Sequence, residues 1–310
     1  MTSKTAASLP ARTRTTGYLL AAAGAALFSS KAIFIKLAYQ EEVNASLMLA
    51  YRMVFAIPFF AAIGIWAVTA KRNSGEAGIR REHVAQAIAT GFAGYYLASY
   101  FDFAGLQYIS AQLERLVLFT YPIMIMFLSA VLKGERLTAH GLAAAGVTYG
   151  GLGFAFASDL PSGLHDTVTG TLLVLSAALC FAIHQIYARP LISALGSALY
   201  TSISMTSASI CCILHHVIVS GADFGASPRF MWLAAACAIA ATVLPALFIN
   251  ASLARISSTA VAMISTLSPL VTIALAVIIL GEPFTLADGL GAVLVIIGVG
   301  IYTRGDSRVV

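Results

Sequence analysis

The chain has 310 residues, of which 10% are charged and 59% hydrophobic, and its mean hydropathy is +0.89. A soluble domain carries about 25% charged residues, so this composition excludes a soluble globular protein. The net charge of +5 does not indicate nucleic acid, because most basic residues fall in expected loops and tails. All four cysteines lie in apolar segments, which favours buried reduced thiols over a disulfide set or a metal site.

Hydropathy and helix-breaking residues predict ten apolar spans along the chain. In order they cover residues 17–38, 46–69, 84–104, 109–132, 139–158, 169–190, 197–219, 230–250, 256–280 and 286–303. At about 20 residues each, the spans leave no room for an aqueous domain. We therefore expect an all-α membrane protein.

The first five spans recur weakly as the second five, because residues 17–154 align with residues 170–301. The alignment pairs Gly17 with Gly170 at a shift of 153, and Ile109 with Ile256, Pro122 with Pro269 and Gly134 with Gly281 at a shift of 147. A repeat with an odd number of spans re-enters the bilayer upside down, as in secondary transporters. The sequence thus predicts two inverted five-helix repeats around a central cavity.

The repeat and the loops also predict the domain organisation and the orientation. We expect a cytoplasmic N-terminal tail (1–16), a first repeat (17–158), an outer connection (159–168), a second repeat (169–303) and a cytoplasmic tail (304–310). With both termini inside, thirteen basic loop residues face the cytoplasm and two face outward. This bias predicts a multi-pass protein of the inner (plasma) membrane with both termini cytoplasmic.

Charged residues inside spans are the first candidates for function, because each costs about 2.5–3.5 kcal/mol at mid-helix. Asp102 and Arg115 end and begin consecutive spans, so we expect a structural ion pair between them. Glu114 points about 100° away from Arg115 on its helix and is the candidate for a gate or a proton-carrying carboxylate. Lys31 either faces the cavity or pairs with a carboxylate such as Glu114. Arg52, near an outer helix end, is expected to snorkel to the interface.

Polar aromatic residues form a second group of candidates. Tyr95, Tyr96 and Tyr100 lie on the third span with Ser99, and Tyr96 shares a helix face with Tyr100. Further tyrosines that could complete an amphipathic pocket are Tyr51, Tyr121 and Tyr187. His184 aligns with Lys31 and is either a hydrogen-bonded packing residue or a ligand.

Pro122 and Pro269 occupy equivalent mid-span positions, where each removes a backbone donor. We expect them to kink their helices beside the cavity and to serve as gating points. Small residues are dense in the fifth and tenth spans, including the Gly146–Gly150 step. These spans are expected to be close-packed scaffold helices and, in a weak homodimer, the subunit contact.

The segment GLQYISAQLERLVLFTYPIMIMFLSAVLKGERLT and its fainter copy ISSTAVAMISTLSPLVTIALAVIILGEPFT resemble the EamA-type exporters of the drug/metabolite transporter superfamily. The resemblance covers residues 17–303 and implies ten helices and a central cavity. It also implies export of amino acids, aromatic and apolar ones included, or of other small metabolites. The lining that it implies comprises Lys31, Tyr95 or Tyr96, Ser99, Glu114, Tyr121, His184 and Asn250.

The sequence therefore predicts a secondary exporter of a small-molecule solute, working by alternating access in the lipid bilayer as a monomer or weak homodimer. No cofactor, metal, nucleic-acid partner or catalytic residue is expected. The alternatives are an exporter of lipophilic cations or other metabolites of the superfamily, and an intramembrane enzyme. An intramembrane protease would need a Gly-x-Ser-x-Gly or an H-E-x-x-H element, and the chain has neither. We therefore expect no enzyme.

Overall fold

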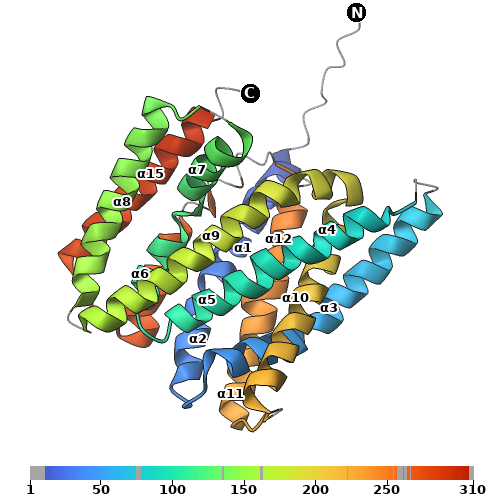
Figure 1. Cartoon of the computed structure of the whole chain (residues 1–310), viewed down its shortest axis with the longest axis horizontal. Helices are drawn as coiled ribbons and strands as arrows, with labels where there is room; N and C mark the ends of the chain where they lie inside the picture. The colour runs from blue at the N-terminus through green and yellow to red at the C-terminus, as the bar shows by residue number, and fades with distance from the viewer. Residues whose placement is uncertain are drawn as a thin grey trace, which may run out of the picture.

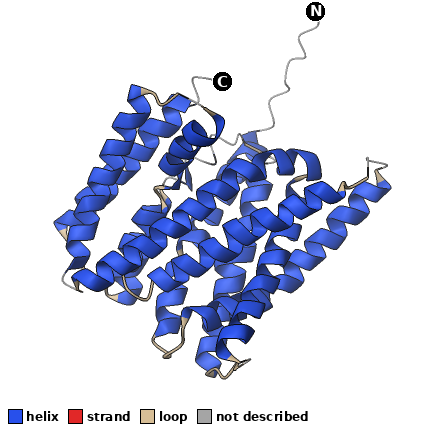
Figure 2. Ribbon diagram, viewed as in Figure 1, coloured by secondary structure: helices blue, strands red, loops and turns tan. Residues whose placement is uncertain are grey.

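The computed structural model describes residues 11–306 apart from 75–77, 135, 161–162, 222, 254, 257–260, 262–263 and 266. Side chains at 11–14, 250, 253 and 303–306 also lie outside this description. Over the described residues the secondary structure is helical, with no strand (Figure 2). This confirms the all-helical expectation for that part of the chain.

The helices follow one another with short connections. The first half contains α1 (Ala11–Ser29), α2 (Lys31–Tyr39), α3 (Ala45–Asn73), α4 (Arg81–Gly91), the π-helix η1 (Phe92–Leu97), α5 (Ala98–Gly105), α6 (Ala111–Leu118), α7 (Tyr121–Lys133) and α8 (Ala139–Asp159). The second half contains α9 (Leu164–Leu195), α10 (Ser197–Ser220), α11 (Pro228–Ala238), the π-helix η3 (Ile239–Val243), α12 (Leu244–Leu253), α14 (Ser268–Leu275), the π-helix η4 (Ala276–Leu280) and α15 (Leu286–Asp306).

Seven helical segments in the described part are long and apolar enough to cross a bilayer. They are Thr15–Tyr39, Ala45–Asn73, Ala111–Lys133, Ala139–Asp159, Leu164–Leu195, Ser197–Ser220 and Pro228–Ile249. Large apolar side chains on their outer faces are open to the surroundings, such as Ile218 at 81% and Trp232 at 78% exposed. In water such surfaces would aggregate, whereas in a bilayer they contact lipid tails. The chain is a multi-pass membrane protein.

Helices from the two halves pack against each other in pairs. The closest partners are α8 with α15, α3 with α10, α1 with α12, and α5 with α9, as Figure 1 shows for α8 beside α15 and for α5 beside α9. Glycines allow the first of these contacts, since a Cβ on Gly298 would lie 2.2 Å from Thr148 Oγ1. Gly146 and Gly150, singled out in the sequence, face open space and take no part in it.

Helix breaks recur at matching places in the two halves. α6 ends at Leu118, and Pro122 lies in the first turn of α7; likewise Pro269 lies in the first turn of α14. Proline is tolerated there because the first N–H groups of a helix have no partner within it. The helices that follow end at Gly134 and Gly281, each with φ +68°. Each proline thus begins a new helix after a break instead of bending a continuous one.

Candidate functional site

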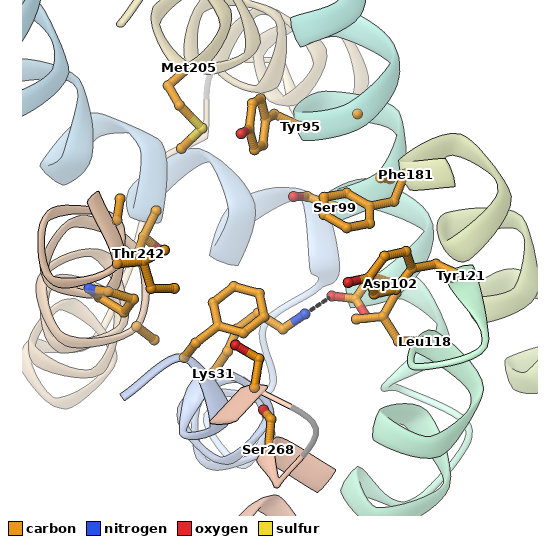
Figure 3. A pocket seen from close by; sticks show the side chains of 18 of the residues that line it. Lys31, Tyr95, Ser99, Asp102, Leu118, Tyr121, Phe181, Met205, Thr242 and Ser268 are labelled. Carbon is orange, nitrogen blue, oxygen red and sulfur yellow. Dashed lines mark hydrogen bonds and ion pairs between the residues drawn. The ribbon is translucent and has the colours of Figure 1, made fainter. Parts of the chain in front are cut away.

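A cavity of about 430 Å³ lies between helices of both halves. This volume is in the range of small-molecule sites, about 300–1,000 Å³. Figure 3 shows side chains from the first half, among them Lys31, Tyr95 and Asp102, around the same space as Met205, Thr242 and Ser268 from the second half. The cavity is the candidate solute site.

Two π-helices form opposite parts of the wall. At the repeat shift of 147 residues, η1 (Phe92–Leu97) is equivalent to η3 (Ile239–Val243). The rare helix type therefore recurs at the same place in both halves. A π-helix carries an extra residue per turn and is frequent at functional sites. Equivalent positions that both line the cavity are Gly94 and Ala241, Tyr95 and Thr242, Ala98 and Pro245, Ser99 and Ala246, and Asp102 and Ile249.

Gly94 lets α9 approach this wall closely. A Cβ at Gly94 would lie 2.1 Å from Cγ of His184. His184 Nδ1 donates to the carbonyl oxygen of Thr90 at 2.8 Å, and its ring meets Tyr95 edge to face at 4.7 Å. His184 therefore lies behind the wall, and the cavity is instead lined by its neighbour Gln185, which was not predicted from the sequence.

Three charged side chains meet beside the cavity. Lys31 Nζ lies 2.5 Å from Asp102 Oδ2 and 3.5 Å from Glu114 Oε1 (Figure 3 marks the first contact). Lys31 is 6%, Asp102 3% and Glu114 0% exposed. Lys31 and Asp102 line the cavity, while Glu114 lies behind them. Of the two options for Lys31, the structure thus shows both: it faces the cavity and is paired.

The ion pair expected between Asp102 and Arg115 is not the one formed. Asp102 pairs with Lys31, and Arg115 Nη2 donates to Ser268 Oγ on α14. Short chain separation brought α5 and α6 together as expected, but the side chain of Arg115 points toward the second half. Ser268 also shares a hydrogen bond of 2.7 Å with Ser29 Oγ, so it joins α1, α6 and α14.

Carboxylates at its N-terminus hold α6 in place. Glu282 Oε1 accepts from the Ala111 N–H at 2.9 Å, and Asp159 Oδ2 accepts from the Ser110 N–H at 2.8 Å. Ser110 Oγ accepts from the Leu113 N–H at 3.0 Å. Negative groups are favourable at a helix N-terminus, where N–H groups lack partners. These contacts fix the turn that carries Glu114 and Arg115.

Arg52 does not snorkel to the interface, because it is 5% exposed and lines the cavity. Its Nη2 donates to Ser99 Oγ at 3.0 Å, and its guanidinium carbon lies 4.6 Å from the centre of the Phe103 ring. Arg115 is similarly placed, 4.8 Å from the centre of the Phe28 ring. A guanidinium stacks on aromatic faces in this way, and its N–H groups donate to hydroxyl oxygens. The sequence indicates that Arg52 is near a helix end, but it does not indicate that other helices bury this side chain.

The remaining candidate residues divide between the cavity and other places. Tyr95, Ser99 and Tyr121 line the cavity. Tyr96 instead shares a hydrogen bond of 2.7 Å with His215 Nδ1, and Tyr187 is 49% exposed in a separate groove between α4 and α9. The side chain of Asn250 lies outside the described residues.

Comparisons with known proteins agree with a transporter. The sequence matches the EamA-like transporter family over residues 15–157 and again over residues 168–304. It is 27% identical over 273 residues to the uncharacterized transporter YcbK of Bacillus subtilis (strain 168), covering 86% of each chain. A solved crystal structure aligns with 94% of this chain and 97% of its own at a TM-score of 0.62 and 19% identity, which supports the fold alone.

Proposed function

The chain belongs to the EamA-like transporter family, and from that premise we propose that it exports small organic solutes, amino acids above all, across the inner membrane by alternating access. The observation that carries this proposal is the cavity of about 430 Å³, lined at equivalent positions by both halves and flanked by buried charges. Charged groups within a membrane are costly and mark solute and ion pathways. Transport, rather than enzymatic catalysis, is the activity that family and cavity support.

The proposed architecture has ten membrane helices in two inverted repeats, with both termini in the cytoplasm. The run α4–η1–α5, the pair α14–η4, and α15 complete the seven longer segments to ten. Packing supports a two-fold relation between the halves: exchanging them converts the α1–α12 contact into the α9–α5 contact. In the pairs α3–α10 and α8–α15 the two helices are equivalents of each other, so the same exchange leaves each contact unchanged. Equivalent helices beside a two-fold axis pack in this way.

Counterflow in proteoliposomes tests the function. Vesicles loaded with unlabelled L-phenylalanine should accumulate labelled L-phenylalanine in a saturable way. Ala98 lines the cavity, so Ala98→Phe should abolish the signal, whereas the same change at the exposed Ala85 on α4 should leave it intact. Flux of tetraphenylphosphonium without flux of any amino acid would overturn the amino-acid assignment.

A lipophilic-cation exporter is the alternative within the family, and the charges of the cavity oppose it. Lys31, Arg52 and Arg115 supply three positive charges, against two negative charges on Asp102 and Glu114. A net positive site repels a cation.

Proton coupling is the form of energy supply that Glu114 supports. It is fully buried, neither carboxylate oxygen has a hydrogen bond, and Lys31 is its charged neighbour at 3.5 Å. Asp102 and Arg115 are the other charged groups beside it. Glu114→Gln should weaken the response of flux to an imposed pH gradient, while a variant that responds like the wild type would leave Glu114 a structural role.

A further inference from the structure

Of the three positive side chains that the structure describes around the cavity, only Lys31 contacts a carboxylate. Lys31 contacts both carboxylates, at 2.5 Å on Asp102 and 3.5 Å on Glu114. The two arginines of the wall have no carboxylate within 4 Å: in the described part of the chain the only other ion pair is Glu41 with Arg229 at the surface. Arg52 and Arg115 are 5% and 4% exposed, and the Nε of each has no hydrogen-bond acceptor. Among the described residues, neither guanidinium group therefore has a carboxylate in direct contact.

We propose that Arg52 and Arg115 form an anion site and that the transported solute carries a net negative charge. A guanidinium cannot lose its proton in a protein, so a buried one needs an anionic partner. Its fork of N–H donors matches a carboxylate. This proposal rests on the proposed export of small organic solutes and narrows the solute to organic monoanions with an apolar or aromatic body, so it competes with the amino-acid assignment.

The count of charges favours a monoanion over a zwitterion. With both carboxylates ionised, three positive and two negative groups leave +1 at the site, which one carboxylate neutralises. A zwitterionic amino acid would leave the excess in place. Of the two carboxylates only Asp102 lines the cavity; its Oδ2 is paired with Lys31 and its Oδ1, which has no hydrogen bond, is buried, so an ammonium group would compete with Lys31 there. Removing the amino group from such a solute should improve its fit.

The rest of the lining suits an apolar body. Phe28 and Phe181 occupy equivalent positions at a shift of 153, and both line the cavity. On the wall formed by the second half, Pro245 and Ile249 continue this surface. An aromatic ring packed here leaves water while its carboxylate remains with the arginines. A phenyl-bearing acid is therefore a suitable probe.

Three probes with the same phenyl body separate the charge requirement from the shape. Binding of 3-phenylpropanoate, L-phenylalanine and 2-phenylethylamine would be measured by isothermal titration on the full chain in lipid nanodiscs. We expect 3-phenylpropanoate to bind at least about tenfold tighter than L-phenylalanine, a difference that one charged hydrogen bond can supply. We expect the amine not to bind. Counterflow of 3-phenylpropanoate should follow the same order.

The outcomes separate this inference from the general function. L-phenylalanine binding as tightly as 3-phenylpropanoate, or tighter, would overturn the anion site and leave amino-acid export standing. Binding of the amine alone would remove both. Binding and counterflow of 3-phenylpropanoate without any flux of amino acids would support the anion site and correct the amino-acid assignment.

Variants then assign the site to the two arginines. Arg52→Met introduces the residue found at the equivalent position, Met205, so it should be accommodated in a span. Arg52→Met and Arg115→Gln should each weaken binding of 3-phenylpropanoate about tenfold or more, and Arg52→Lys should lose less. Arg229→Gln, at the surface, is the matched control and should bind like the wild type. Folded arginine variants with unchanged affinity would contradict the proposal; if either variant fails to fold, the three-probe series on the wild type decides.

Discussion

The wall of the cavity presents Tyr95, Ser99 and Asp102 in the first half, whereas the positions 147 residues later carry Thr242, Ala246 and Ile249. The contrast extends to every charge buried at the site. Charged residues of the first half and their uncharged equivalents are Lys31 and His184, Arg52 and Met205, Asp102 and Ile249, Glu114 and Val261, and Arg115 and Ala262. Both halves thus share the backbone framework, including the equivalent π-helices η1 and η3, but only the first half carries these charges.

This difference separates what alternating access needs from what recognition needs. Opening a cavity first to one side and then to the other requires two halves of similar shape. Selecting a solute requires a wall whose polarity differs from one side to the other. With charged groups on the first half and uncharged groups on the second, a solute has one favourable orientation. Substitutions that give one half the residue of the other, or that remove a contact of one half alone, test this separation.

Asp102→Ile gives the first half the residue of the second and should cause the largest effect. It removes the carboxylate that lies 2.5 Å from Lys31 Nζ, and Lys31 is buried. Breaking one side of a buried ion pair costs about 3–5 kcal/mol. The yield of folded protein and the midpoint of thermal unfolding in detergent should both fall.

The double variant Lys31→Met with Asp102→Ile is the control, because it removes both charges. It should recover most of the lost stability, since a well-packed apolar pair is often as stable as a buried ion pair. Equal instability of the single and double variants would mean that volume, and not the pairing of charge, determines stability here.

Gly94→Ala and Ala241→Gly exchange the residues at equivalent positions of the two π-helices. A Cβ at Gly94 meets the His184 ring at 2.1 Å, and the contact with Thr90 leaves that ring little freedom. Overpacking of this kind costs about 1–3 kcal/mol. The reverse change in the second half should cost only about 0.5–1 kcal/mol, as glycine does inside a helix. Thermal unfolding of the two variants measures the difference, and a larger loss for Ala241→Gly would contradict the packing role given to Gly94.

Much of the fold could be predicted, because its causes are local. Apolar length predicts membrane helices, and the paired Pro122 and Pro269 predicted kinks where the structure has breaks between helices. The π-helices could not be predicted, since no residue type in η1 or η3 demands an extra residue in the turn. The family match over both halves agrees with the repeat that the sequence shows.

The site was predicted in part, and the errors have a common cause. Tyr95 with Ser99, and Tyr96 with Tyr100, are both pairs at a spacing of four, so each pair shares a helix face. Spacing does not tell which face meets the cavity, and tyrosine suits either. In the same way, spacing predicted that Asp102 pairs with Arg115, but in the structure Lys31 on α2 pairs with Asp102 instead.

Ser268→Ala removes the contact by which the second half holds Arg115 and should have a moderate effect. Ser268 accepts from Arg115 and shares a hydrogen bond with Ser29, and it is 4% exposed. Loss of hydrogen bonds at a buried site of this kind costs about 1–3 kcal/mol when partners remain unsatisfied. Thermal unfolding gives the cost. Ser193→Ala, on an exposed part of α9, is the control and should change stability little, because its hydroxyl bonds only to its own helix.

Thr242→Val should have the smallest effect and tests the apolar character of the second wall. The Thr242 hydroxyl donates to the carbonyl oxygen of Cys237 at 3.2 Å, one turn back in its own helix region, so it is not reserved for a solute. Valine has nearly the same shape, and the lost local bond is of the kind that contributes little. Affinity for a phenyl-bearing acid should therefore change by less than about twofold, which corresponds to about 0.4 kcal/mol. Tyr95→Phe, the same removal of a hydroxyl at the equivalent position, gives the comparison on the charged wall. A large loss of affinity in Thr242→Val would mean that the second half also recognises a polar group, and the single orientation argued from the charges would then be wrong.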